Sequence, residues 1–116
     1  MKKVIISQIG VGYWGPNLLR NLVANKECEV KTVVELSEDR RNFVKGLYPE
    51  IVTTNKVDEV FNDSEVDAVV VATPVASHFD LTMKALETGN HVLVEKPMAT
   101  TVAEVKQIGK LAEEKG

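Results

Sequence analysis

Three glycines near the start of the chain have the spacing needed to bind an anion through the backbone. Gly10, Gly12 and Gly15 form the pattern G-x-G-x-x-G between an apolar run at residues 4–6 and a helix-like stretch at residues 17–23. In such a strand-to-helix turn the first glycine permits a tight turn, the second lets a phosphate approach the backbone, and the third lets the helix pack closely. The N-terminus of the helix adds unpaired N–H groups and a positive dipole end. The pattern predicts a turn that binds the pyrophosphate of a dinucleotide.

Glu35 strengthens this prediction, because glycine patterns alone are weak signals. It follows a second apolar run, residues 30–34, and lies 20 positions beyond Gly15. In a βαβ unit an acidic residue at this distance lies at the tip of the second strand, where its carboxylate can accept hydrogen bonds from the adenosine ribose. A carboxylate repels a 2′-phosphate, so NAD is favoured over NADP. The alternative is an exposed strand-end glutamate with no ligand.

Two arginines follow Glu35 at the start of an expected helix. Either guanidinium, that of Arg40 or that of Arg41, could stack on the adenine ring of the cofactor. Each could equally be a solvated charge. A nearby arginine also keeps the use of NADP open.

A second loop, residues 73–78, follows the apolar run at residues 69–72. Pro74 disfavours the α conformation at Thr73, and we expect both residues to border the nicotinamide ribose. His78 could reach ribose or phosphate oxygens. An equally weighted alternative is that His78 packs in the first turn of a helix against the loop.

The segment Glu95-Lys96-Pro97 follows the last apolar run and would place an amine beside the nicotinamide ring. A charged amine that hydrogen-bonds a substrate hydroxyl favours the alkoxide that develops as hydride leaves the same carbon. Pro97 restricts Lys96 and could form a cis bond. From position alone, a solvated lysine at the end of a strand is the more ordinary interpretation.

The elements that must hold these residues follow from the hydrophobic pattern. Apolar runs of strand length alternate with segments of helical periodicity, which is typical of a parallel sheet covered on both faces. Ser77 with Asp80, and Thr101 with Glu104, have the spacing of a capping box. We expect strands near residues 2–9, 29–35, 51–53, 67–73 and 91–95, and helices near 15–25, 38–48, 56–62, 77–88 and 101–115.

Right-handed crossovers place these strands in the order 3-2-1-4-5, with the cofactor where the first and fourth strands diverge. The fold class is α/β, a Rossmann-type doubly wound parallel sheet that forms one dinucleotide-binding domain over residues 1–116. A full sheet of this type has a sixth strand, which we expect to be missing here. The fifth strand would then be an exposed apolar edge, so we expect a homo-oligomer paired through residues 91–95, or a truncated chain.

The composition and charge exclude some classes of binding partner. A chain of 116 residues with a formal charge of −3 argues against a nucleic-acid or anionic membrane surface. Its apolar spans are too short for secretion or membrane crossing, which favours a cytoplasmic location. Cys28 is the one cysteine, so no internal disulfide forms, and no metal site is expected.

Three motifs together resemble those of the glucose-fructose oxidoreductase, inositol dehydrogenase and rhizopine-catabolism family, Gfo/Idh/MocA, over nearly the whole chain. They are Gly10-Val11-Gly12-Tyr13-Trp14-Gly15-Pro16-Asn17, Ala72-Thr73-Pro74 with His78, and Val94-Glu95-Lys96-Pro97. The resemblance implies the NAD-binding domain of an oxidoreductase that transfers hydride between nicotinamide and a hydroxyl carbon of a sugar or nucleotide sugar. It also implies that Lys96 is catalytic and acts on the substrate hydroxyl. The expected cofactor-binding residues are Gly10, Gly12, Tyr13, Trp14, Gly15, Glu35, Arg40, Thr73, Pro74, His78, Glu95 and Lys96.

The chain departs from the family in two ways. Ser7 and Gln8 put polar groups where the family usually has small or apolar residues, and each needs a partner if buried. We expect the family's carboxy-terminal domain, which carries the substrate pocket, to be absent, and we therefore expect NAD binding without turnover. The alternatives are a non-catalytic module that senses nucleotide or assembles with partners, and a methyltransferase. Lys96 argues against both, and Gly15 argues further against the second.

Overall fold

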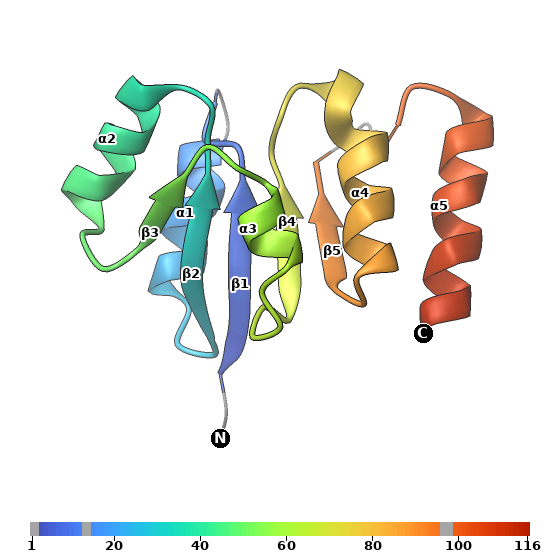
Figure 1. Ribbon diagram of the computed structural model, residues 1–116, viewed down its shortest axis with the longest axis horizontal. Helices are drawn as coiled ribbons and strands as arrows, with labels where there is room; N and C mark the ends of the chain where they lie inside the picture. The colour runs from blue at the N-terminus through green and yellow to red at the C-terminus, as the bar shows by residue number, and fades with distance from the viewer. Residues whose placement is uncertain (1–2, 13–14, 96–98) are drawn as a thin grey trace.

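The computed structural model describes residues 3–12, 15–95 and 99–116 as a parallel sheet flanked by helices (Figure 1). Its five strands have the order β3-β2-β1-β4-β5, which confirms the predicted Rossmann-type α/β topology. The strands are β1 (Val4–Ile9), β2 (Cys28–Val34), β3 (Val52–Thr54), β4 (Ala68–Val71) and β5 (His91–Val94). The helices are α1 (Gly15–Ala24), α2 (Glu38–Leu47), α3 (Asp58–Phe61), α4 (His78–Glu87) and α5 (Val102–Lys115), and a 3₁₀ turn, η1 (Val75–Ser77), precedes α4.

The strand register aligns the carboxyl ends of the central strands. Ile9, the last residue of β1, pairs with Val34 of β2 on one side and with Val71 of β4 on the other. Val71 in turn pairs with Val94, the last residue of β5. The loops that follow these strands therefore begin at one edge of the sheet, which is the upper edge in Figure 1.

Helices cover both faces of the sheet, as the pattern predicts. In Figure 1 α1 lies behind the sheet, and α3 and α4 lie in front of it. Leu19 of α1 and Val44 of α2 share an apolar cluster with Val33 of β2, so α2 lies on the same face as α1. Helix α5 packs beside α4 through a cluster that contains Leu86 and Ile108. No helix in the described parts of the chain has the length and apolarity that crossing a bilayer requires.

The two expected capping boxes differ in outcome. The Glu104 N–H donates to Thr101 Oγ1 at 3.1 Å, as expected, while the Glu104 carboxylate accepts from the Thr100 N–H at 3.1 Å. The prediction for Ser77 was wrong. Its side chain makes no cap hydrogen bond, because a 3₁₀ turn precedes α4 and directs the hydroxyl to Pro74 O, 2.9 Å away.

Candidate functional site

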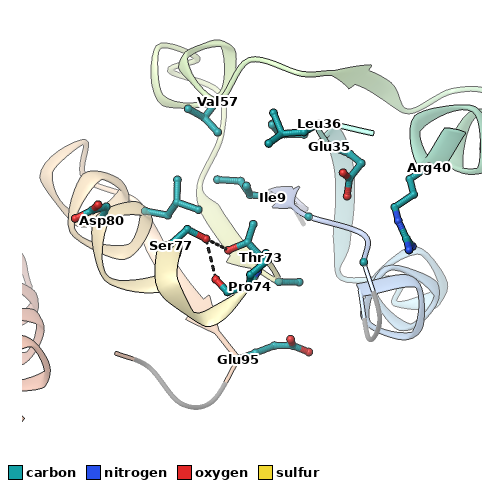
Figure 2. Close-up of a pocket in the computed structure, with 15 residues that line it drawn as sticks. Ile9, Glu35, Leu36, Arg40, Val57, Thr73, Pro74, Ser77, Asp80 and Glu95 are labelled. Atoms are coloured by element: carbon teal, nitrogen blue, oxygen red, sulfur yellow. Dashed lines mark hydrogen bonds between the residues drawn. The ribbon is translucent and has the colours of Figure 1, made fainter. Parts of the chain in front are cut away.

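A cavity of about 660 Å³ lies at the carboxyl edge of the sheet, where the predicted site residues gather. Figure 2 shows Glu35 and Arg40 on one side of it and Thr73, Pro74 and Ser77 on the other. The loops after β1, β2, β4 and β5 all contribute. The predicted residues that line it are Gly10, Gly12, Glu35, Arg40, Thr73, Pro74 and Glu95.

The three glycines of the turn meet different constraints. Gly10 has a φ of +95°, and a Cβ there would lie 2.6 Å from Ala72 O. A Cβ at Gly15 would lie 2.8 Å from Gly10 O, so the helix could not approach the turn as closely. A Cβ at Gly12 would meet no described atom within 4 Å. The fold of the described chain therefore requires Gly10 and Gly15, whereas Gly12 leaves open space on the cavity wall.

The Glu35 carboxylate links the loops that follow β1 and β2. Its Oε1 accepts a hydrogen bond from the Val11 N–H, and its Oε2 accepts one from the Ser37 N–H, each at 2.9 Å. A carboxylate oxygen has lone pairs for a further donor, so Glu35 can hold this position and still accept from a ligand hydroxyl. The carboxylate lies directly after β2, as the spacing predicts.

The two arginines have separate partners. Arg40 Nη1 donates to Val11 O at 3.2 Å, and the residue lines the cavity. Arg41 Nη1 instead donates to Glu35 O at 2.6 Å and to Leu36 O at 2.9 Å, which ties it to the backbone after β2. Of the two candidates for contact with adenine, Arg40 is the one at the cavity.

His78 lies beneath the loop that follows β4 and is not part of the cavity lining. It is 2 % exposed, and its Nε2 lies 2.6 Å from Thr73 O. Ser77 Oγ contacts Thr73 Oγ1 at 2.6 Å in the same loop. These contacts fix the conformation of Thr73 and Pro74, which do line the cavity.

Several lining residues are not among the predicted site residues, although Leu36 and Ser77 lie in predicted site segments. Leu36, Val57 and Leu81 add apolar surface, and Ser77 and Asp80 add polar groups. Leu36 is 82 % exposed, and an apolar residue directly after the acid at the end of a strand is a signal that could have identified it. Val57 lies at the start of α3 and Leu81 lies on α4, so only the fold brings these two residues to the cavity.

Ser7 and Gln8, two buried polar residues of β1, differ in their hydrogen bonding. Gln8 Nε2 donates to Gly10 O and to Gly15 O, each at 2.9 Å, whereas Gln8 Oε1 has no hydrogen-bond partner among the described residues. Ser7 Oγ has no hydrogen-bond partner among the described residues, contrary to expectation. Tyr13, Trp14, Lys96 and Pro97 lie outside the described residues, and so does the possible cis bond before Pro97.

Comparison with known proteins identifies the family of this chain. Residues 4–116 match the Gfo/Idh/MocA model, described as an oxidoreductase family with an NAD-binding Rossmann fold. The chain is 31 % identical over 111 residues to the oxidoreductase YdgJ of Escherichia coli, and 30 % identical over 114 residues to the scyllo-inositol 2-dehydrogenase (NADP⁺) IolW of Bacillus subtilis. Each match covers 96 % of this chain and 32 % of the relative. The chain therefore spans about a third of the length of these relatives.

Solved structures give the same result. GenD2 from gentamicin A biosynthesis, in complex with NAD, superposes with a TM-score of 0.94 at 28 % identity, over 100 % of this chain and 33 % of that one. Biliverdin reductase from Synechocystis, in complex with biliverdin and NADP⁺, superposes with a TM-score of 0.91 at 26 % identity, over 97 % of this chain and 35 % of that one. The glycine turn, the carboxylate after β2 and the family match lead to one conclusion: this chain belongs to the Gfo/Idh/MocA oxidoreductase family and has its NAD-binding Rossmann fold.

Proposed function

We propose that this chain binds NAD and serves as the cofactor domain of a dehydrogenase that acts on a hydroxyl carbon of a sugar or nucleotide sugar. The observation that carries the proposal is that Gly12 and Glu35 line the same cavity, with Glu35 hydrogen-bonded to the neighbouring Val11 N–H. Gly12 leaves space for a phosphate, and the Glu35 carboxylate is fixed by two backbone N–H groups beside it. A pyrophosphate and a ribose diol are the ligand groups that fit this pair.

The remaining parts of the cofactor fit the other walls of the cavity. Adenine would lie against Leu36 and the Arg40 guanidinium, and the nicotinamide half would extend toward Thr73, Pro74 and Glu95. His78 would act on this half through Thr73, whose carbonyl it contacts. Because the fixed carboxylate of Glu35 repels a 2′-phosphate, NAD is preferred and NADP is the weaker ligand.

The catalytic step is assigned to Lys96. The bound cofactor supplies the nicotinamide that accepts or gives hydride. Lys96, directly after Glu95, would donate a hydrogen bond to the substrate hydroxyl and favour the developing alkoxide. Residues 1–116 form the dinucleotide-binding domain in this proposal, and a substrate pocket outside these residues completes the active site. The isolated chain then binds NAD without turnover. The relative IolW is a scyllo-inositol 2-dehydrogenase, and its polyhydroxylated ring substrate supports the sugar class that we propose here.

The proposal places the protein in the cytoplasm as a homo-oligomer. Strand β5 is the last strand of the described sheet, and Leu93 on it is 55 % exposed. An exposed apolar edge strand tends to pair with another chain. Sedimentation should therefore show a species heavier than a monomer, and Leu93→Lys should shift it toward the monomer. A clean monomer of the unmodified chain at high concentration would contradict this part of the proposal.

Isothermal titration of the purified chain with NAD, NADP and S-adenosylmethionine tests the class of function. We expect binding of NAD, weaker binding of NADP, and no heat with S-adenosylmethionine. Heat and a thermal shift with S-adenosylmethionine but not with NAD would show that the dehydrogenase proposal is wrong and would favour a methyltransferase.

A further inference from the structure

Gln8 is a buried polar residue near the end of the central strand, and its side chain contacts the glycine turn. It is 0 % exposed, and its strand neighbours are Val33 of β2 and Val70 of β4. Val33 and Val70 pack in the clusters that contain residues of α1, so Gln8 faces α1 as well. Its side chain therefore extends into the space between the sheet and the start of α1.

The Gln8 amide joins the two ends of the glycine turn. Nε2 donates to Gly10 O, where the turn leaves β1, and to Gly15 O, in the first residue of α1. Both hydrogens of the amide group are thereby used. A Cβ on Gly15 would lie 3.3 Å from this nitrogen, so the third glycine also makes room for the Gln8 amide.

The peptide between Gly10 and Val11 is consequently held from both sides. Gln8 binds its carbonyl oxygen, and Glu35 binds its N–H at 2.9 Å. A peptide unit is planar, so two hydrogen bonds on its opposite sides fix its orientation. The first part of the turn is thus set by the protein itself.

One polar atom of the Gln8 side chain lacks a hydrogen-bond partner, which is a cost that an apolar residue would avoid. Its Oε1 is buried and has no hydrogen-bond partner among the described residues. A buried polar atom without a partner destabilises the folded state, so Leu or Met would be the less costly residue for packing alone. The Nε2 contacts with the turn are what Gln8 adds and what an apolar side chain cannot replace.

We propose that Gln8 is a positioning residue that holds the glycine turn in its pyrophosphate-binding shape before the cofactor arrives. This inference rests on the proposed binding of NAD. A preformed turn loses less conformational entropy on binding, so Gln8 raises the affinity for ligands that carry a pyrophosphate. The effect is independent of the nicotinamide ring and extends to ADP-ribose.

The test compares Gln8→Leu and Gln8→Met with Ser7→Ala. Ser7 is the matched control, because it precedes Gln8 in β1, is also 0 % exposed, and has a hydroxyl without a described partner. We expect both Gln8 variants to bind NAD and ADP-ribose about tenfold more weakly, because two hydrogen bonds to the turn are lost. Ser7→Ala should bind both ligands within twofold of the unmodified chain. Thermal unfolding identifies any variant that is not folded.

A measurement on the unmodified chain keeps the test decisive if neither variant folds. Without cofactor, ¹⁵N relaxation should give order parameters of about 0.85 for the N–H groups of Val11 and Gly12, as in rigid backbone. Values below about 0.6 would show a turn that is not preset and would overturn the inference. Unchanged NAD affinity in a folded Gln8 variant would overturn it as well. If the unmodified chain binds no NAD at all, the proposed function fails instead.

Discussion

The carboxylate of Glu35 accepts a hydrogen bond from the Val11 N–H at 2.9 Å across 24 positions of sequence. Arg40 donates to the carbonyl of the same residue at 3.2 Å. The residue after β2 and the start of α2 therefore hold the glycine turn after β1 from both sides of Val11. The expected ribose-binding acid and the expected pyrophosphate-binding turn form one connected unit, so a change in Glu35 affects both.

Replacing Glu35 tests its assignment to the adenosine ribose. Glu35→Ala removes the acceptor for the ribose hydroxyls and also frees the Val11 and Ser37 N–H groups. Hydrogen bonds to a charged group contribute about 1.5–3 kcal/mol, so we expect NAD affinity to fall about 10- to 100-fold. NADP affinity should fall less, because the repulsion of its 2′-phosphate is removed as well. Titration calorimetry with both cofactors measures the difference.

Glu29 provides the control for this experiment. It lies on the same strand, is exposed, and is close to the other end of β2. Glu29→Ala should change neither affinity by more than about twofold, because exposed charges far from a ligand are largely screened. An equal loss of NAD and NADP affinity in Glu35→Ala would contradict the ribose assignment and leave Glu35 as a support for the turn alone.

Alanine substitutions should separate the glycines of the turn by their effects. Gly10→Ala and Gly15→Ala place a Cβ 2.6–2.8 Å from backbone oxygens, so we expect each to lower the free energy of unfolding by about 1–3 kcal/mol. Gly12→Ala meets no described atom within 4 Å and should leave stability within about 0.5 kcal/mol, yet weaken NAD binding at least about tenfold. Thermal unfolding and calorimetry on the same samples give both quantities.

Gly46, near the end of α2, is the matched control for the glycine series. A Cβ there also meets no described atom within 4 Å, and it lies away from the cavity. Gly46→Ala should stabilise the chain by up to about 1 kcal/mol through higher helix propensity, with NAD affinity unchanged. If Gly12→Ala behaves like Gly46→Ala in both measurements, the phosphate does not contact Gly12.

The proposed role of Lys96 predicts a separation of binding from catalysis. Lys96→Met removes the donor to the substrate hydroxyl and keeps a side chain of similar length. In the form of the protein that carries a substrate pocket, we expect kcat to fall by at least about 100-fold, while NAD affinity changes by less than about fivefold. Stopped-flow measurement of NADH formation and direct titration give the two values. Unchanged kcat would remove Lys96 from the reaction, and no turnover in the unmodified protein would favour a non-catalytic binding module.

The sequence predicts the fold well because its signals are local and repeated. Each strand of a buried parallel sheet is an apolar run, and right-handed crossovers leave little freedom in the order of β1, β2 and β4. Gly10 and Glu35 were found for the same reason, because their spacing reflects the fixed length of a βαβ unit. Their places at one cavity follow from the register of Ile9 with Val34 and Val71.

Contacts between loops could not be predicted in this way. The backbone contacts of Glu35 and Arg40 depend on how the glycine turn approaches the loop and the helix that follow β2, and sequence spacing does not contain that distance. Ser77 was expected to cap α4, but a 3₁₀ turn before the helix directs it to the Thr73 loop. His78 shows the same limit, since only the packed loop places its ring against Thr73 O.

An ion pair far from the cavity predicts how the free energy of unfolding changes at low pH. Lys31 Nζ of β2 lies 2.6 Å from both Asp63 Oδ2 and Glu65 Oε1. The hydrogen bond from Lys31 lowers the pKa of Asp63 below its ordinary value, and the two carboxylates raise the pKa of Lys31. The Asp63 contribution is therefore present above its ordinary pKa and is lost as the pH falls below about 4. The Lys31 contribution is lost only as the pH rises beyond about 10.4.

Lys31→Met should consequently reduce stability at pH 6 and lose this effect at low pH. We expect the difference in the free energy of unfolding between the unmodified chain and the variant to shrink from pH 5 to pH 2, as measured by urea unfolding. The control is Lys45→Met, on α2, because Lys45 is exposed and forms no ion pair with the described residues. A difference that stays constant over this range would mean that Asp63 does not depend on Lys31.

The most direct test of the central claim is an NMR titration of the ¹⁵N-labelled chain with NAD. The seven glycines give few and well-separated signals, and three of them form the turn. We predict saturable shifts of the Gly10, Gly12 and Gly15 N–H signals, with the Gly46 and Gly109 signals unchanged. Saturation with no shift at the three turn glycines, or shifts that centre on α2 or α5, would contradict a cofactor site at the glycine turn.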